Sequence, residues 1–436
     1  MEPSESMWIT RERKTDPLKV QIVSTYYAPE TTGNAPYVTS LARGLAQRGH
    51  EVSVLAGAPH YPGWEILPRS EWREEEIVDR VHVRRIASFV PKRPNFASRL
   101  LYEAGYGAKF ASRARSDADV TILVSPNLFA SAVVRAKMAT SRRRRPPTLL
   151  WIQDLYSQGV GETPGTAARL MGGAMRAIEG GLARRCSKVV VIHDRFRRVL
   201  VERLNVEPRQ VATVRNWTHV PTAGVVDVPE VRDKWGWVSP DEVVVLHAGN
   251  MGAKQGLENV IRAARYAEAN GLPVRFVLMG DGNQRAQLTA SAAGCARVQF
   301  IAPLPEREFL EALRAADVLL VNERPTLNEA AVPSKLTTYF TTGRPVLAAT
   351  AEDSTTADEI RASHAGAIVP PDDPKALADT ALALSQAWSE ADAAAGPAFV
   401  HRHLSSESAL SAFDDLLREI AANDSATSVA SLGRKT

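Results

Sequence analysis

The residues best suited to chemistry form the stretch His247-Ala-Gly-Asn-Met-Gly-Ala-Lys-Gln-Gly256, which follows an apolar run and opens an amphipathic helix. Gly249, Gly252 and Gly256 allow the backbone to approach a ligand closely. Free amides at a helix N-terminus attract anions, and Lys254 adds a full positive charge beside them. This pattern suits a diphosphate leaving group, which gains negative charge as its bond breaks. A plain strand-to-helix turn would show the same glycines, and the Gly-Lys-Ser/Thr of a Walker loop is missing.

A second candidate site lies in the stretch from Glu329 to Val346. Pro333 precedes a predicted helix that begins at Ser334, and Gly343 ends this helix before the next strand. The Ser334 hydroxyl and the free amides of the first turn could hold phosphate or sugar hydroxyls, and Lys335 supplies a second cation. An ordinary capped helix explains the same residues.

Other reactive residue types lack a supporting pattern. Asp117-Ala-Asp119 has the letters of a metal-binding Asp-x-Asp motif, but it precedes a strand instead of following one. His60, and the pair His193-Asp194 after a strand, could each contact a ligand or be ordinary loop residues. The cysteines Cys186 and Cys295 lie far apart and show no zinc-ligand spacing. We therefore expect no metal site.

Strand and helix signals alternate in both halves of the chain. Short runs rich in Val, Ile and Leu are typical of strands covered on both faces, as in parallel sheets. Val38, Leu41 and Leu45 follow helical spacing between the first two strands. This order predicts two doubly wound α/β domains with a ligand cleft at the carboxyl ends of their strands. The predicted strands are Lys19–Ser24, Glu51–Leu55, Val81–Ile86, Asp119–Ser125, Thr148–Asp154, Lys188–Ile192, Val211–Val214, Val243–His247, Val274–Met279, Arg297–Ile301, Asp317–Val321, Pro345–Ala348 and Ala367–Val369.

The expected domains cover residues 18–220 and 240–395, and the proline-containing segment Pro221–Pro240 is expected to link them. Residues 1–17 and 424–436 are expected to be disordered. No apolar segment has the length of a signal-peptide core or of a membrane span. These features predict a cytoplasmic protein.

The charge is divided unevenly along the chain. The net charge is +4, but residues 1–220 hold 34 basic and 21 acidic residues, and the remainder holds 19 basic and 28 acidic ones. The densest basic run is Arg142 to Arg145. An anionic surface on the inner face of the plasma membrane or a nucleic acid could bind such a half, and ordinary solvated helix faces would also produce it. Aromatic residues are not interleaved with these arginines, so we expect no nucleic-acid partner.

Several stretches together resemble glycosyltransferase family 4, in particular its branch with colanic-acid and O-antigen transferases. They extend along most of residues 19–390, and their combination is specific although each alone is common. The stretches are Ser24-Thr-Tyr-Tyr-Ala-Pro-Glu-Thr-Thr-Gly33, Leu45-Ala-Gln-Arg-Gly-His-Glu-Val52, Pro59-His-Tyr-Pro-Gly63, Trp151-Ile-Gln-Asp154, Asn216-Trp217, Gly249-Asn-Met-Gly-Ala-Lys-Gln-Gly-Leu257, Met279-Gly-Asp-Gly282 and Pro333-Ser-Lys-Leu336.

The resemblance implies a GT-B fold, in which two Rossmann-like domains face a cleft. It implies a hexosyltransferase that takes a sugar from a nucleotide-diphosphate donor, retains the anomeric configuration and needs neither metal nor cofactor. The acceptor, a saccharide or a lipid-linked sugar, would lie on the first domain, and the product would belong to a cell-surface polysaccharide or glycoconjugate. A helix at about residues 400–420 would pack back on the first domain, as the family's C-terminal segment does.

The family's motif residues divide into three groups on this chain. Lys254 and Lys335 would neutralise the departing diphosphate, and Glu329 would orient ribose or sugar hydroxyls. The donor-binding positions would be Gly33, Gly249, Asn250, Gln255, Gly256, Gly280, Asp281, Pro333, Ser334 and Thr338. The acceptor-side positions would be Asn34, His60 and Asp154. No side chain is assigned as nucleophile, because a same-face mechanism uses the leaving phosphate to assist deprotonation of the acceptor.

The chain departs from the family at its carboxylates. The usual Glu-x7-Glu pair falls on Ala330 and Thr338; Glu329 lies beside the first position, and Glu323 is a weaker substitute. The other departures are Asn250 and Gln255 at positions where Arg and Lys are frequent, and Gln153 where His is frequent. Two alternatives remain: a nucleotide-sugar 2-epimerase on the same fold, and a non-catalytic GT-B subunit that has lost the glutamate pair.

Overall fold

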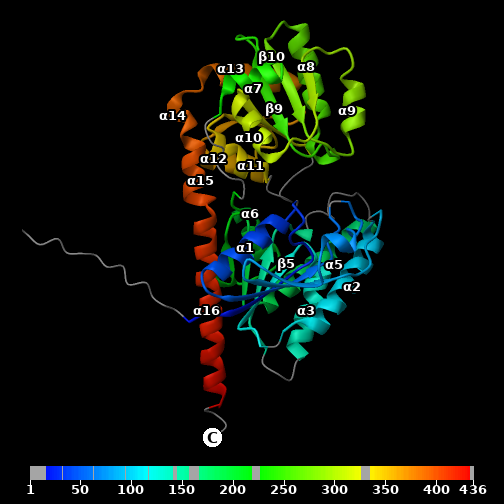
Figure 1. Cartoon of the computed structure of the whole chain (residues 1–436), viewed down its shortest axis with the longest axis vertical. Helices are drawn as coiled ribbons and strands as arrows, with labels where there is room; N and C mark the ends of the chain where they lie inside the picture. The colour runs from blue at the N-terminus through cyan, green and yellow to red at the C-terminus, as the bar shows by residue number, and fades with distance from the viewer. Residues whose placement is uncertain are drawn as a thin grey trace, which may run out of the picture.

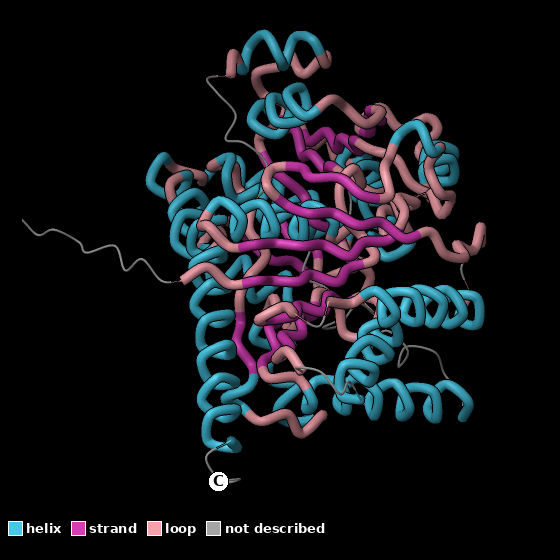
Figure 2. The backbone as a smooth tube through the Cα atoms, turned by 60° about the horizontal axis from the view of Figure 1, so that its bottom comes forward, coloured by secondary structure: helices cyan, strands magenta, loops and turns pink. Residues whose placement is uncertain are grey.

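The computed structural model describes residues 16–31, 33–61, 63–93, 95–115, 117–140, 145–156, 166–218, 226–325 and 334–432. They form two α/β domains, one above the other in Figure 1, and a long C-terminal helix that runs down the side of the first. Figure 2 shows strands side by side with helices around them. The predicted pair of doubly wound domains is confirmed.

The first domain is built on an eight-stranded sheet with the order β3-β4-β2-β1-β5-β6-β7-β8. All neighbouring strands are parallel except β3 and β4. Its strands are β1 (Lys19–Ser24), β2 (Glu51–Gly57), β3 (Glu75–Val78), β4 (Val81–Ile86), β5 (Val120–Ser125), β6 (Thr148–Ile152), β7 (Lys188–Val191) and β8 (Val211–Thr213). Its helices include α1 (Ala35–Gln47), α2 (Phe96–Arg113), α3 (Leu128–Thr140), α5 (Thr166–Arg185) and α6 (Asp194–Arg198).

The second domain is built on a six-stranded parallel sheet with the order β11-β10-β9-β12-β13-β14. Its strands are β9 (Val243–Ala248), β10 (Val274–Met279), β11 (Val298–Ile301), β12 (Val318–Asn322), β13 (Val346–Ala349) and β14 (Gly366–Val369). Its helices include α7 (Val228–Lys234), α8 (Glu258–Ala269), α9 (Arg285–Ser291), α10 (Glu306–Ala315), α11 (Lys335–Tyr339), α12 (Thr355–Ser363) and α13 (Pro374–Ala387).

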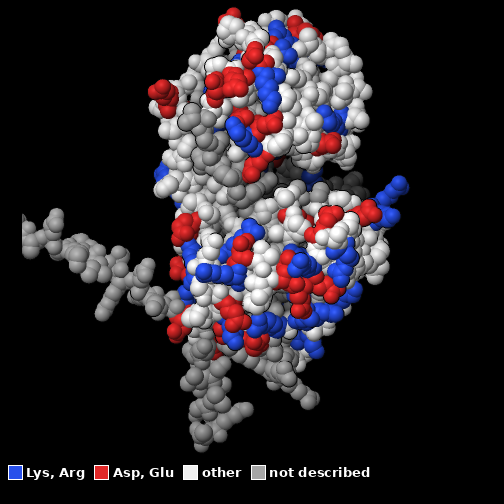
Figure 3. All heavy atoms as spheres, viewed as in Figure 1, with Lys and Arg blue, Asp and Glu red and all other residues white. Residues whose placement is uncertain are grey.

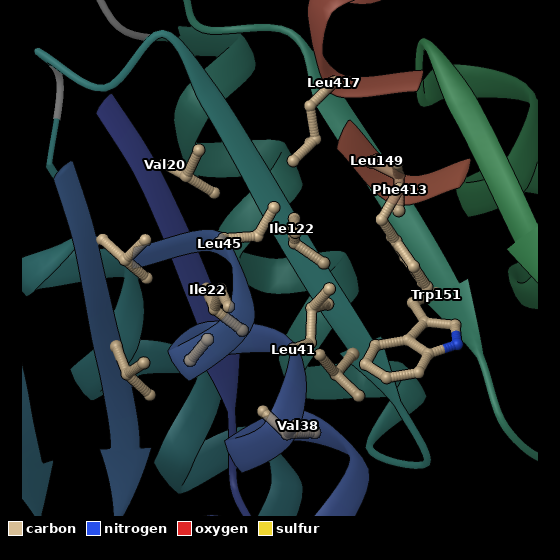
Figure 4. Packing of buried hydrophobic residues seen from close by; sticks show 14 of the residues in the cluster. Val20, Ile22, Val38, Leu41, Leu45, Ile122, Leu149, Trp151, Phe413 and Leu417 are labelled. Atoms are coloured by element: carbon tan, nitrogen blue, oxygen red, sulfur yellow. The ribbon is translucent and has the colours of Figure 1, made fainter. Parts of the chain in front are cut away.

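The final helices connect the two domains. After α14 (Glu390–Ala393) and α15 (Ala395–His403), helix α16 (Ser406–Leu432) packs on the first domain. Phe413 lies 4.9 Å from the Trp151 ring, centroid to centroid, within one buried cluster that also holds Val38 and Leu417 (Figure 4). Gly44 of α1 lets the two helices pack closely: a Cβ there would lie 2.4 Å from Leu410 Cδ2. The C-terminal helix therefore belongs to the core of the first domain.

Three expectations at the segment boundaries differ from the structure. The linker range contains α7, which packs Val231 into the core of the second domain, so this domain begins before residue 240. Helix α16 continues to Leu432, past the expected boundary of the tail at Asp424. At the other end, Asp16 is described and its carbonyl accepts a hydrogen bond from Arg418 (3.1 Å). Residues 1–15, 219–225 and 433–436 lie outside the described residues.

Candidate active site between the two domains

The predicted glycine loops interlock at the carboxyl ends of β9 and β10. Gly249 and Gly280 have φ angles of +130° and +131°. A Cβ on Gly280 would lie 2.0 Å from the Gly249 carbonyl oxygen, which no side chain tolerates. The Met251 amide donates to the Asp281 carbonyl at 2.8 Å. Gly280 and Asp281 therefore hold the first loop in shape through their backbone.

Lys254 lies in the short turn Ala253–Gln255 that follows Gly252. The Gly252 amide donates to Gln255 Oε1 at 3.0 Å, so the Gln255 side chain caps this turn. Lys254 is exposed, and among the described residues no carboxylate lies within ion-pair distance of its ammonium group. The loop thus presents one unneutralised cation.

Lys335, at the start of α11, lies against the same loop. Its Nζ is 3.4 Å from both ring nitrogens of His247, and a Cβ on Gly249 would lie 3.8 Å from it. Burial lowers the pKa of Lys335 to about 8, and the Glu323 carboxylate acts in the opposite direction. Burial, with the Lys335 charge, holds the pKa of His247 far below its usual range, so this ring is neutral and its unprotonated nitrogen can accept a hydrogen bond from the lysine. The two predicted lysines therefore flank one loop.

The predicted carboxylate Glu329 and the predicted donor residue Pro333 lie outside the described residues. Glu323 is described: its carboxylate accepts from Thr350 Oγ1 at 2.6 Å and from Thr356 Oγ1 at 2.8 Å. Burial raises the pKa of Glu323, and those hydrogen bonds and the Lys335 charge lower it. Glu323 is thus a fixed carboxylate electrostatically coupled to Lys335.

A cavity of about 620 Å³ lies between the domains, where Figure 3 shows a hollow between the two lobes. It brings together five predicted residues from both domains: Gly33, Asn34 and Asp154 from the first, Lys254 and Ser334 from the second. Gly33 has φ of +64°, and a Cβ there would lie 3.4 Å from the Tyr61 ring. The remaining described lining comprises Tyr26, Tyr37, Tyr61, Arg99, Leu100, Glu103, Pro126, Phe129, Gln153, Leu155, Tyr156, Met175, Ile192 and Asn216.

Of the predicted donor residues that the structure describes, only Gly33 and Ser334 line this cavity. Gly249, Asn250, Gln255, Gly280 and Asp281 belong to the glycine loops around Lys254, and Thr338 and Gly256 lie elsewhere. Thr338 is buried within α11 and is 6% exposed. Gly256 lines a different cavity of about 580 Å³, on the α8 side of the second domain. Its carbonyl accepts from Asn322 Nδ2 at 3.0 Å, so Gly256 shapes the turn into α8.

Polar atoms of the first domain lack partners at the cavity. Both side-chain atoms of Asn34, the residue before α1, are buried without a hydrogen bond. Gln153 Oε1 accepts from Asn216 Nδ2 at 2.8 Å, but Gln153 Nε2 and Asn216 Oδ1 are also buried without a partner. Because buried polar atoms are nearly always hydrogen-bonded, these groups are suited to bind a polar ligand.

Asp154 and Arg99 bring opposite charges to the cavity. Asp154 lines the cavity; its partial removal from water by the cavity walls raises the pKa of this carboxyl to about 6, while the charges of Lys254 and Arg99 lower it. Arg99, on α2, was not predicted. It precedes Asp154 by more than fifty residues, and only the fold places the two beside one cavity.

His60, predicted on the acceptor side, is buried behind the cavity, where it holds the loop that carries Tyr61. Its ring is 2% exposed; Nδ1 donates to the Ala58 carbonyl at 2.7 Å and Nε2 accepts from the Tyr102 hydroxyl at 2.8 Å. The Glu30 carboxylate accepts from the amides of His60 and Tyr61, both at 2.8 Å. His60 and Glu30 therefore fix the loop that carries Tyr61 into the cavity.

The other sequence candidates have structural roles. His193 Nε2 lies 3.3 Å from Glu359, and Arg195 forms a bidentate pair with Asp358, so this segment joins the two domains. Asp119 accepts from the Lys19 amide at 2.9 Å. Both cysteines are buried and free. Within the described ranges no three His, Cys, Asp or Glu side chains are grouped as metal ligands.

Two Rossmann-like domains with a glycine-rich, lysine-bearing loop at their cleft define a glycosyltransferase of the GT-B fold. Residues 32–217 match the family described as Glycosyl transferase 4-like domain, and residues 242–387 match Glycosyl transferases group 1. The chain belongs to this glycosyltransferase family. It is 30% identical over 341 residues to WcaI of Escherichia coli (strain K12), which carries the provisional name of a colanic acid biosynthesis glycosyl transferase; the match covers 75% of this chain and 82% of WcaI.

Solved structures agree on the fold. HepE of Anabaena in complex with UDP superposes with a TM-score of 0.66 at 14% identity, covering 92% of this chain and 100% of HepE. Sucrose-phosphate synthase of Thermosynechococcus elongatus superposes with a TM-score of 0.70 at 17% identity, and the match covers 93% of this chain and 99% of the synthase. Across the described part of the chain, no helix combines the length and apolar character needed to span a membrane.

Proposed function

We propose that this chain transfers a hexosyl group from a nucleotide-diphosphate sugar to a saccharide or lipid-linked acceptor, with retention of anomeric configuration, in cell-surface polysaccharide or glycoconjugate biosynthesis. The observation that carries the proposal is the cavity in which Lys254 and Ser334 of one domain face Asn34 and Asp154 of the other. A donor on the second domain and an acceptor on the first would meet there.

The donor side suits a diphosphate. The exposed Lys254 and the partly buried Lys335 lie on either side of the loop Gly249–Gly252. Ammonium groups in a poorly solvated site stabilise charge that develops on a leaving phosphate. These two cations would supply the positive charge that a divalent metal supplies in other transferases. We therefore propose that transfer needs neither metal nor cofactor. UDP in HepE makes a uridine nucleotide a natural first donor to test.

In the proposed step, the acceptor hydroxyl attacks the anomeric carbon on the face from which the diphosphate leaves. The bond from the anomeric carbon to the phosphate oxygen breaks, and that oxygen takes the acceptor proton. Lys254 and Lys335 stabilise the negative charge of the leaving group. Asp154, which lines the cavity, would accept a hydrogen bond from an acceptor hydroxyl.

The basic first half supports a further part of the proposal, that the enzyme works on the inner face of the plasma membrane. Residues 1–220 carry a formal excess of 13 positive charges, from 34 basic and 21 acidic residues. Such a surface attracts anionic lipid within a Debye length. The run Arg142–Arg145 lies outside the described residues except Arg145. The test is binding to anionic vesicles, which should weaken as salt is added. An enzyme that does not bind these vesicles even at low salt would contradict this part.

The test is a transfer assay with a panel of nucleotide sugars and a lipid extract as acceptor, with NMR of the product's anomeric proton. We expect the donor's configuration to be kept and the rate to be unchanged in EDTA. An inverted product would contradict retention. Release of nucleotide without any acceptor, together with an epimerised sugar, would favour the epimerase. Donor binding without turnover under any condition would favour a non-catalytic subunit.

A further inference from the structure

The end of strand β12 is bonded to the turn that carries Lys254. Asn322, the last residue of the strand, is 1% exposed, and its Nδ2 donates to the carbonyl oxygens of Gln255 at 2.8 Å and Gly256 at 3.0 Å. The Arg324 amide donates to the Lys254 carbonyl at 3.2 Å. A Cβ on Gly256 would lie 2.9 Å from Arg324 Cγ, so glycine lets the strand end approach the turn. Three consecutive carbonyl groups of this turn are therefore held by one strand end.

Asn322 is itself held by helix α8. Its Oδ1 accepts from Asn259 Nδ2 at 3.0 Å, and Asn259 is 2% exposed. Asn259 Oδ1 accepts from Arg262 Nη2 at 3.4 Å, and Arg262 pairs with Asp372. With these partners the Asn322 amide has one orientation. Exchanging its oxygen and nitrogen would set two donors against each other at α8 and two acceptors against each other at the turn.

Glu323, the next residue along the chain, acts on the other lysine. Thr356 Oγ1 and Thr350 Oγ1 each donate to one of its two carboxylate oxygens, at 2.8 and 2.6 Å, so the carboxylate keeps one position. Burial lowers the pKa of Lys335 to about 8, and the Glu323 charge acts in the opposite direction. From β9, the neutral His247 ring lies 3.4 Å from Lys335 Nζ. Glu323 thus supplies negative charge that favours the ammonium form of this lysine.

We infer that Asn322 and Glu323 are positioning residues of the donor site: Asn322 fixes the turn that presents Lys254, and Glu323 holds Lys335 in its charged form. Both line the cavity on the α8 side and not the one between the domains, so they act through the lysines and not by contact with the donor. The inference rests on the proposed function and extends it, because one strand end then controls both cations that face the leaving diphosphate.

The coupling of Glu323 to Lys335 is tested by acetylating the full chain with a trace of acetic anhydride across neutral and alkaline pH. Mass spectrometry of the Lys335 peptide gives the fraction of uncharged lysine, which should be half-maximal at about pH 8 in wild type. Glu323→Gln should react about threefold faster at about pH 7, because loss of the negative charge leaves more of the lysine uncharged. Glu323→Asp, which keeps the charge, should stay near wild type. The exposed carboxylate variant Glu352→Gln is the matched control. An unchanged profile in Glu323→Gln would overturn this half of the inference.

The role of Asn322 is tested by binding titrations with UDP-glucose in a double-mutant cycle with Lys254. Asn322→Ala should weaken UDP-glucose about tenfold, but less than about twofold in the Lys254→Ala background, because the side chain that it positions is then absent. Asn270→Ala, at an exposed position of the same domain, should change nothing. If Asn322→Ala does not fold, Asn259→Ala replaces it in the cycle, since it removes only the bond that orients Asn322. Equal weakening in both backgrounds would overturn the assignment of Asn322.

Failure of the proposed function gives a different result. If neither UDP-glucose nor any other nucleotide sugar of the panel binds to wild type, the proposed donor is contradicted, and the acetylation profile alone decides whether Glu323 controls the charge of Lys335. Normal donor binding with an additive cycle and an unchanged acetylation profile overturns the inference and leaves the proposed function intact.

Discussion

Lys254 of the second domain and Asp154 of the first face the same cavity, and the lysine charge lowers the pKa of the aspartate across the domain boundary. Neither group forms an ion pair within its own domain among the described residues. The cavity therefore has a cation on the side proposed for the donor diphosphate and a carboxylate on the side proposed for the acceptor hydroxyl.

Lys335 predicts a pH dependence of donor binding. Because burial lowers its pKa to about 8, the ammonium form is present at pH 7 and is lost as the pH rises through 8. A bound diphosphate favours the charged form, so the affinity for a nucleoside diphosphate should fall between about pH 7 and pH 9. Calorimetric titration across this range should show the fall in wild type. Lys335→Ala should bind weakly and with a flat profile; an unchanged slope in this variant would contradict the assignment.

We expect replacement of Asp154 to raise the stability of the protein and to lower its activity. Its pKa of about 6 exceeds the unfolded value of about 3.9, so its contribution to the free energy of unfolding falls as the pH rises from about 4 to about 6. Asp154→Asn should stabilise the ligand-free protein at pH 7 by about 1 kcal/mol. This value is smaller than the pKa difference alone would give, because water in the cavity screens the charge. The same variant should lose most of its transfer rate.

Urea unfolding at pH 4 and pH 7 measures the first effect, which should vanish at pH 4. Asp241→Asn, an exposed aspartate of the second domain, serves as the control. A destabilised Asp154→Asn at pH 7 would show that the carboxylate forms a favourable contact that the structure does not contain.

Gly280 should be intolerant of a side chain. A Cβ there would lie 2.0 Å from the Gly249 carbonyl oxygen, so Gly280→Ala must displace the loop that carries Lys254. We expect a loss of about 2–4 kcal/mol in the free energy of unfolding. Gly271→Ala is matched for positive φ (+66°) but has open space around it, and should cost about 1 kcal/mol. Equal losses in both variants would contradict the interlocked-loop account.

The parts of the fold that sequence predicts are those determined by local pattern. Strands such as β1 and β9 are buried along their length, so their apolar runs identify them. Strand β3 was missed because Glu75–Val78 is an exposed antiparallel edge without such a run. Within the site, the loop glycines and Lys254 are local motif residues, whereas Arg99 depends on how α2 packs. The role of His60 could not be predicted either, since its partner Tyr102 comes from that same distant helix.

Helix α16 should be required for the stability of the first domain. Phe413 is buried against Trp151 and Trp217. Phe413→Ala would leave a cavity in this cluster and should cost about 3–5 kcal/mol, measured by urea unfolding. Phe89→Ala, at a half-exposed position of the same domain, should change stability by less than about 0.5 kcal/mol. A small effect of Phe413→Ala would mean that α16 is dispensable for the core.

The central claim is that a nucleotide-diphosphate sugar binds at the Lys254 loop. Thermal shift against a panel of nucleoside diphosphates and their sugars tests it most directly, in wild type, Lys254→Ala and the exposed control Lys375→Ala, because a ligand that binds only the folded state raises the Tm. We predict that one nucleotide and its sugar raise the Tm of wild type and Lys375→Ala, and that Lys254→Ala loses the shift. No shift from any nucleotide, or a full shift in Lys254→Ala, would contradict the claim.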